Sequence, residues 1–209
     1  MGLHCSQLCI AASSACEVNK LSTIFVIRES RITNMILKPQ DVLITLKLVA
    51  SGKAIQWRFN DLAIELDMSV SETHAGVKRA QRAGLVHVFD GRLQVSLRAL
   101  EEFLLHGLRY VFVPDRGEIT RGLPTAHAAR PIASHVVTNE EPPPVWPSSE
   151  GPVRGLAFSP LYKSAPQAAL RDATLYELLV IVDTLRGGRA RERKIAASEL
   201  SRRLADYER

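Results

Sequence analysis

One stretch of this chain, SVSETHAGVKRAQRAGLV at residues 69–86, gathers side chains that suit contact with a charged partner. At about 100° per residue on a helix, Thr73, Val77 and Ala80 share one side and predict a buried face. The opposite side carries small and basic side chains, at Ser71, Ala75, Lys78 and Arg82. Such a face suits a polyanion better than it suits acid–base or nucleophilic chemistry.

A helix of this width fits the major groove of double-stranded DNA, where its N-terminal half would reach base edges. The residues expected there are Ser71, Glu72, Ala75 and Lys78. Arg79 and Arg82 would lie closer to phosphates, and His74 and Arg79 flank the outer face. Glu72 would repel phosphate, so it must accept from a cytosine amino group or point aside. An alternative stays open, in which the basic residues form an ordinary solvated face.

Two further helices are expected before this stretch. Apolar residues recur at helical spacing from Pro39 to about Ala50, and Gly52 lies just beyond them. Proline at the start and glycine past the end are typical of helix boundaries. Asn60 is a suitable N-cap for the second helix, DLAIELD, whose Leu62, Ala63 and Leu66 form its apolar side.

Ser69 or Ser71 is expected to cap the third helix, which runs to Gly84. Within it, Gly76 would let the second helix approach closely. The next residues, VHVFDGRLQV, place Asp-Gly between two short runs of strand character. This pattern predicts a tight β-hairpin with Arg92 beside its tip.

The run LAIELDMSVSETHAGVKRAQRAGLV resembles the winged helix-turn-helix of MarR-like bacterial regulators, in its LA, its S-x-S and its closing GLV. Thr73 and Ala80 stand where larger aliphatic residues are usual in that family. The resemblance implies a winged helix-turn-helix DNA-binding domain over residues 35–112, in a two-fold dimer on double-stranded DNA. The hairpin would be its wing, bringing Arg92 to the backbone or the minor groove.

The remainder of the chain is expected to be an arm and a helical region. Ser96 is expected to cap a fourth helix, LRALEEFLLHGLRY. Residues 113–165 are rich in Gly, Pro and Ser without a helical or strand period, which predicts an extended arm or linker. Trp146 within it is either docked on the domain or a partner-binding element.

Residues 166–209 predict two helices, the first capped by Asp172, with a Gly187-Gly188 break between them. This region has too little apolar surface to fold alone. It must pack on the first domain, on a second copy or on another protein, and dimerisation is the leading use. The fold class expected is mainly α with a small β-hairpin wing and a C-terminal helical extension.

Residues 1–34 are expected to be a loose tail. Cys5, Cys9 and Cys16 are the only cysteines, and their spacing fits no common structural zinc pattern. The segment LCIAASSAC lacks a preceding Lys/Arg region and contains two serines, which argues against a signal peptide. Met35 directly precedes the first helix, so translation is expected to begin there. A cytoplasmic location follows.

No catalytic motif is present. The histidines form no HExxH, and neither GxSxG nor GxxxxGK[ST] occurs. Glu101 and Glu102 are adjacent and would point about 100° apart on a helix, and GRARER near residue 188 suits a solvated helix start. The sequence therefore predicts no enzyme activity, no metal and no cofactor, and it lacks an apolar run long enough to span a membrane.

With 27 Lys and Arg against 22 Asp and Glu, the net charge of +5 agrees with a polyanionic partner. The leading hypothesis is a sequence-specific transcriptional regulator. The alternative is an antitoxin-like autoregulator in which residues 140–209 bind a cognate toxin protein. A winged-helix adaptor without DNA contact is the third hypothesis.

Overall fold

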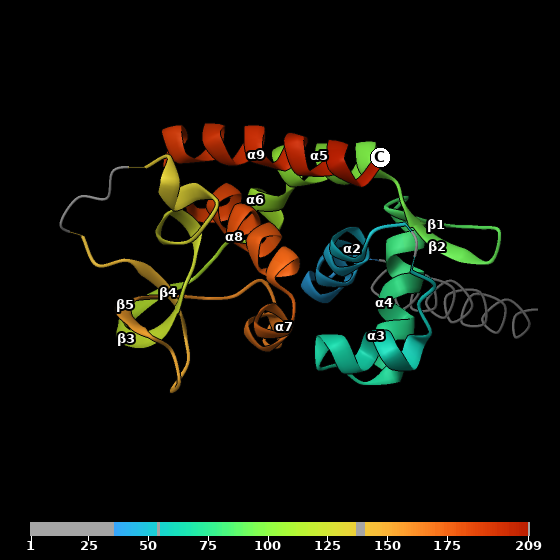
Figure 1. Cartoon of the computed structure of the whole chain (residues 1–209), viewed down its shortest axis with the longest axis horizontal. Coiled ribbons are helices and arrows are strands. Elements are labelled where there is room, and N and C mark those ends of the chain that lie inside the picture. Colours follow the sequence, from blue (N-terminus) through green and yellow to red (C-terminus); the bar gives the residue numbers. More distant parts are fainter. Residues whose placement is uncertain (1–35, 54, 137–140, 209) are drawn as a thin grey trace, which may run out of the picture. The chain divides into compact units, whose positions relative to one another are not determined.

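Helices make up most of the described chain, together with a β-hairpin and a small three-stranded sheet (Figure 1). The computed structural model describes residues 36–53, 55–136 and 141–208. The predictions about the cysteines, Met35 and the tail lie outside these ranges. In the described ranges, no helix combines the length and the apolar character needed to cross a membrane.

The predicted order of three helices and a hairpin is confirmed. The elements are α2 (Pro39–Ser51), α3 (Phe59–Leu66), α4 (Val70–Arg82), β1 (Val86–Phe89) and β2 (Arg92–Val95). Helix α3 begins before the predicted cap Asn60, because the Leu62 amide already donates to the Arg58 carbonyl at 3.1 Å. Asp67 ends α3 in the left-handed conformation, at φ 53°, and so turns the chain toward α4.

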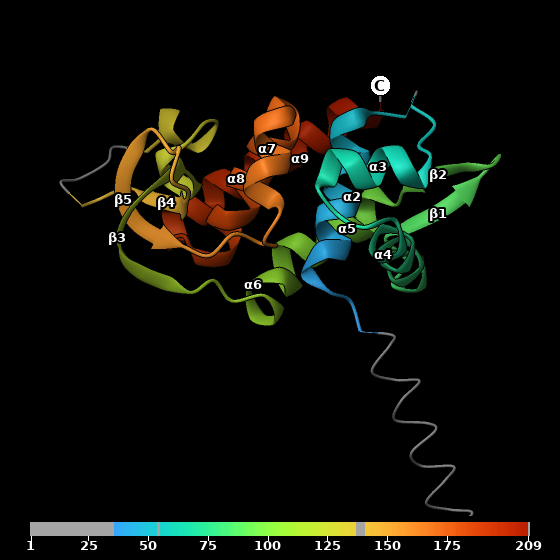
Figure 2. The ribbon, with the colours of Figure 1, turned by 90° about the horizontal axis from the view of Figure 1, so that it is seen from below.

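Helix α2 is buried on every side. All residues from Asp41 to Val49 are buried, among them the polar Thr45 and Lys47. The reason is that α2 contacts α4 and β2 on the one hand and α8 (Ala173–Gly187) on the other. Figure 2 shows α2 between these parts of the chain. A helix that is buried around its whole circumference is expected in such a central position.

Residues 113–165 do not form the predicted extended arm. They contain three strands, β3 (Arg116–Pro124), β4 (Pro144–Pro147) and β5 (Val153–Phe158). Strand β3 pairs antiparallel with both others, and β4 pairs parallel with β5. Each strand therefore has two neighbours, which closes this small sheet on itself.

Glycines that suggested a linker allow the close approach of these strands. A Cβ atom on Gly122 would lie 2.0 Å from the carbonyl oxygen of Trp146, and one on Gly155 would lie 1.9 Å from that of Pro143. Any side chain at either position would collide with backbone. These strands therefore lack an alternating apolar pattern because they are short and because some of their positions must be glycine.

Trp146 is docked and not a free partner-binding element. Its side chain is completely buried, and its indole N–H donates to the carboxylate of Asp183 on α8 at 2.6 Å. Its ring also meets Tyr176 edge to face, with centroids 5.7 Å apart. The sheet is therefore fixed to α8 through a side chain of β4.

The predicted C-terminal helices and their break are confirmed. They are α8 and α9 (Ala190–Glu208), and a short helix α7 (Ala165–Arg171) precedes them. Asp172 caps α8 as expected, accepting from the Leu175 amide at 3.0 Å. Before the sheet, α5 (Leu97–Glu102) and α6 (Leu108–Val111) are joined by a π-helical turn. Helix α9 lies along α5, and α8 contacts α2, so the C-terminal region packs on the first part of its own chain (Figure 1).

Candidate functional site

Helix α4 has a buried side and an open side, as its sequence predicts. Thr73, Val77 and Ala80 are buried, and the Ser69 hydroxyl caps the helix by accepting from the Glu72 amide at 3.2 Å. Gly76 also faces inward, but its close neighbour is α2 and not the predicted α3. A Cβ atom there would lie 2.5 Å from the Ile44 Cδ1 atom.

Arg79 is held within the protein by Asp41 of α2. Its Nε atom donates to Oδ2 at 2.8 Å and its Nη2 atom to Oδ1 at 2.7 Å, a bidentate pair. Asp41 is completely buried, and its Oδ2 atom also accepts from the Lys38 amide at 2.9 Å. The hydrogen bond with Asp41 raises the pKa of Arg79. This guanidinium therefore joins α4 to α2, whereas the sequence suggested a phosphate contact.

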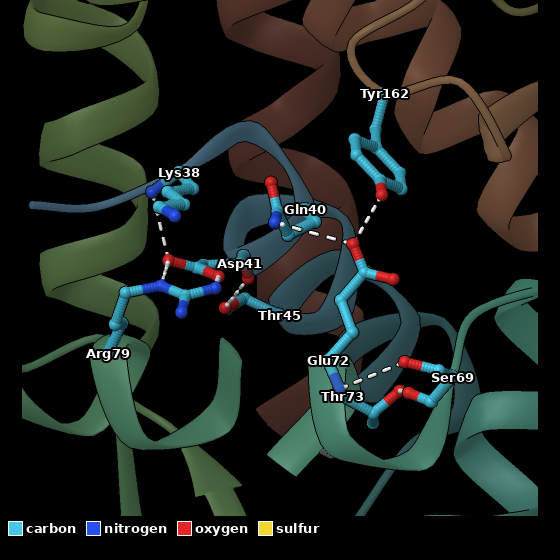
Figure 3. A network of polar contacts seen from close by, with 9 residues as sticks. All are labelled: Lys38, Gln40, Asp41, Thr45, Ser69, Glu72, Thr73, Arg79 and Tyr162. Carbon is cyan, nitrogen blue, oxygen red and sulfur yellow. Dashed lines mark hydrogen bonds and ion pairs between the residues drawn. The ribbon is translucent and has the colours of Figure 1, made fainter. Parts of the chain in front are cut away.

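Glu72 points aside from the outer face of α4. Its Oε1 atom accepts from the phenol of Tyr162, and the Gln40 side-chain amide lies 3.5 Å from the same oxygen (Figure 3). Burial, together with the hydrogen bond to Glu72, raises the pKa of Tyr162 to about 12. Because Tyr162 lies between β5 and α7, this contact joins the start of α4 to a distant part of the chain. The sequence allows Glu72 either to accept from a cytosine amino group or to point aside, and the geometry agrees with the second alternative.

His74 lies on the other flank of α4. Its ring meets that of Phe59, the first residue of α3, edge to face with centroids 5.0 Å apart. The imidazole itself is exposed. His74 therefore marks the border between α3 and the open side of α4.

The open side consists of three exposed residues, Ser71, Lys78 and Arg82, with Ala75 half-buried between them. Among the described residues, Lys78 and Arg82 make no hydrogen bond or ion pair. We call Ser71, Ala75, Lys78 and Arg82 the open face of α4. Its two cations are available to an external anion, unlike the cation of Arg79.

The hairpin supplies a third such cation. Arg92 begins β2, is exposed and, like the cations of the open face, has no ion pair within the described chain. Asp90 and Gly91 form the predicted two-residue turn, with φ 50° and 70°. The hairpin extends beside α4 and away from the helices in both views (Figures 1 and 2).

Sequence reasoning missed the partners of Arg79 and Glu72. Asp41 lies in the first turn of α2, where an acidic residue is common in any helix. Its position therefore gave no indication that it also binds Arg79. Tyr162 is separated from Glu72 by 90 residues and stands in a segment without any local pattern. No sequence signal could have joined these two residues.

The described residues contain no group of three His, Cys, Asp or Glu side chains that could hold a metal ion. A cavity of about 40 Å³ lies beside Arg116, His127, Phe158 and Gly187. It has room for no more than a few water molecules.

Comparison of the chain with protein-family models, with curated proteins and with solved structures found no match. The site is therefore interpreted from its own geometry.

Proposed function

We propose that this chain is a sequence-specific DNA-binding regulator of the winged helix-turn-helix type. Helix α4 is the reading helix, and the β1–β2 hairpin is the wing. The observation that carries the proposal is the division of charge on α4. Arg79 and Glu72 are tied to other parts of the chain, while Lys78 and Arg82 remain unpaired beside small side chains.

The small side chains matter as much as the cations. Ser71 and Ala75 stand in the N-terminal half of α4, where a helix in the major groove comes nearest to base edges. Their size allows the helix backbone to approach the groove. Lys78 and Arg82 lie one and two turns beyond Ala75 and are suited to phosphates, which fix the orientation of the helix without reading sequence. We therefore assign Lys78 to the DNA backbone, and not to the base edges that the sequence predicted it would reach.

The contacts of Arg79 and Glu72 support this role because they fix α4 without occupying its open face. Both contacts lie near the N-terminus of α2 (Figure 3). A reading helix must keep its orientation for its side chains to meet particular bases. The bidentate Arg79 pair limits rotation of α4 against α2.

The experiment is a DNA-retention series on fragments selected from the host genome. Lys78→Ala and Arg82→Ala should each weaken binding and lower the slope of log affinity against log salt by roughly one. Ser71→Ala should instead change which sequence is preferred. Arg191→Ala and Lys194→Ala, exposed cations of α9, are the matched controls and should leave binding unchanged. If Lys78 and Arg82 can both be removed without loss of binding, α4 is a solvated face and the proposal is wrong.

The two-fold dimer, the bacterial cytoplasm as its location and the antitoxin-like alternative remain predictions. The apolar residues of α8 are already buried within the chain. A cognate toxin would therefore have to bind the exposed side of α9 or another outer surface. Purification of the chain with the product of a neighbouring gene would favour that alternative.

A further inference from the structure

Two large apolar residues are exposed at the far end of the hairpin. Val88 is 57% exposed and Phe89 is 64% exposed. Single exposed apolar residues are common on protein surfaces, so exposure alone has no meaning here. The exposure of Phe89 becomes significant because of its position at the hairpin tip and its immediate neighbours.

The strand register pairs Phe89 directly with Arg92. Directly opposed side chains in an antiparallel pair lie on the same side of the sheet, within contact distance. The pair His87 and Gln94 follows on this side, two residues further from the turn. The tip therefore presents an aromatic ring next to a guanidinium group, followed by polar side chains.

The hairpin is joined to the end of α4 by backbone and core contacts. The Leu85 amide donates to the Ala80 carbonyl at 3.0 Å, and the Ser96 amide donates to the Leu85 carbonyl at 2.9 Å. Val86 and Val95, paired at the base of the hairpin, are buried. The tip is consequently held in a set position relative to Lys78 and Arg82.

We propose that Phe89 is an apolar wedge that enters the DNA minor groove beside the major-groove site of α4. This inference rests on the proposed DNA-binding function. Arg92 would lie in the groove near the phosphates, and the ring of Phe89 would press against a base step and partly unstack it. Architectural proteins bend DNA in this way, by combining basic residues with an inserted apolar side chain.

DNA is favoured over a protein partner because Phe89 is paired with a cation, Arg92, on a hairpin that is joined to the helix carrying Lys78 and Arg82. Arg92 adds a cation to those of the open face, against the one acid of the turn, Asp90. A wedge also predicts specificity outside the α4 contacts. Pyrimidine–purine steps unstack most easily, so binding should favour such a step under the hairpin tip.

The test uses the full chain and a selected DNA fragment. The fragment carries fluorophores at its two ends and 2-aminopurine at the base step expected under the hairpin tip. Wild type should shorten the end-to-end distance and raise the 2-aminopurine fluorescence. Phe89→Ala should remove both signals and lower affinity about tenfold, the order of one lost base–aromatic contact. Its salt slope should stay unchanged, whereas Arg92→Ala should lower the slope by roughly one.

Phe89→Leu keeps an apolar wedge and should retain most of the bend. Val113→Ala, at a residue 68% exposed outside the hairpin, is the matched control and should behave as wild type. If Phe89→Ala binds and bends DNA like wild type, the wedge is refuted while the proposed function stands. A change in oligomeric state of Phe89→Ala with the bend retained would show that Phe89 contacts protein and would also refute it. Absence of any salt-dependent DNA binding by wild type would overturn both proposals.

Discussion

Two buried carboxylates, Asp41 and Asp183, each face an arginine, but they hold very different parts of the molecule. Asp183 accepts from the Thr125 hydroxyl at 2.8 Å, the Trp146 indole at 2.6 Å and Arg186 at 2.7 Å. Arg186 is almost entirely buried and also donates to the Phe112 carbonyl at 2.8 Å. Burial raises the pKa of Asp183, although its three donors oppose this shift.

The Asp41 pair lies at the border of the protein. Asp41 is buried, but the side chain of Arg79 is 11% exposed. Asp183 thus joins the sheet, α8 and the end of α6 in the interior, whereas Asp41 joins two helices under a surface that stays open. The comparison indicates that one pair maintains the fold and the other sets the orientation of α4.

Asp183→Ala should have the largest effect. It leaves Arg186 without its buried counter-charge and the Trp146 N–H without an acceptor, so the free energy of unfolding should fall by about 3–5 kcal/mol. Denaturant unfolding measures this change. Glu141→Ala, which breaks the exposed pair with Arg189, is the control and should cost less than about 1 kcal/mol. Equal losses in the two variants would remove the distinction between buried and surface pairs.

Asp41→Ala should cost less, about 2–3 kcal/mol, because Arg79 can turn toward water once its partner is gone. The variant should also weaken DNA retention, since α4 loses its anchor on α2. Asp41→Asn keeps an acceptor for the Lys38 amide and should lose less stability. A variant as unstable as Asp183→Ala would show that both pairs act on the whole fold.

Gly76→Ala sharpens the comparison on the α4 side. The added methyl group would lie 2.5 Å from Ile44 Cδ1 and 3.0 Å from Asp41 Oδ1. Overpacking of this kind should lower the free energy of unfolding by about 1–2 kcal/mol. Thermal melting of Gly76→Ala beside Lys78→Ala, on the open face, measures it. Unchanged stability in both variants would mean that α2 can move away from α4.

Tyr162→Phe should have the smallest effect, about 1 kcal/mol, because it removes one hydrogen bond to Glu72. The pKa of Tyr162 is raised to about 12 from an ordinary value of 10.0. The neutral phenol is thus favoured in the folded state. Its contribution is present below pH 10 and is lost as the pH rises toward 12.

Melting of wild type and Tyr162→Phe across this alkaline range tests the sign. Wild type should lose more stability than the variant as the pH rises. Tyr110→Phe, at a residue 72% exposed, is the control and should follow wild type. Parallel curves for wild type and Tyr162→Phe would contradict the link between Tyr162 and Glu72.

The parts that sequence predicted depend on local rules. Pro39 and Gly52 mark the ends of α2, Ser69 caps α4, and Asp-Gly makes the hairpin turn. The helical period also identified Lys78 and Arg82 as outward-facing residues. Each of these signals involves only a few neighbouring residues, so it can be recognised in one sequence.

The parts that sequence missed depend on contacts between distant residues. The strands of residues 113–165 owe their pairing to close backbone approach at Gly122 and Gly155, and their attachment to Trp146 and Asp183. Arg79 was expected to contact phosphate because no local pattern links it to Asp41, which lies 38 residues earlier in the chain. Local sequence patterns do not indicate such contacts between distant residues.

The burial of α2 on every side has a consequence for how this protein can be divided. Lys47 of α2 donates to Asp172, the cap of α8, at 2.8 Å, and the helix contacts both α4 and α8. A fragment ending at residue 112 would present to water the side of α2 that α8 covers. Helix α4 and the hairpin therefore cannot be separated from α8 without exposing the buried side of α2 on which α4 packs.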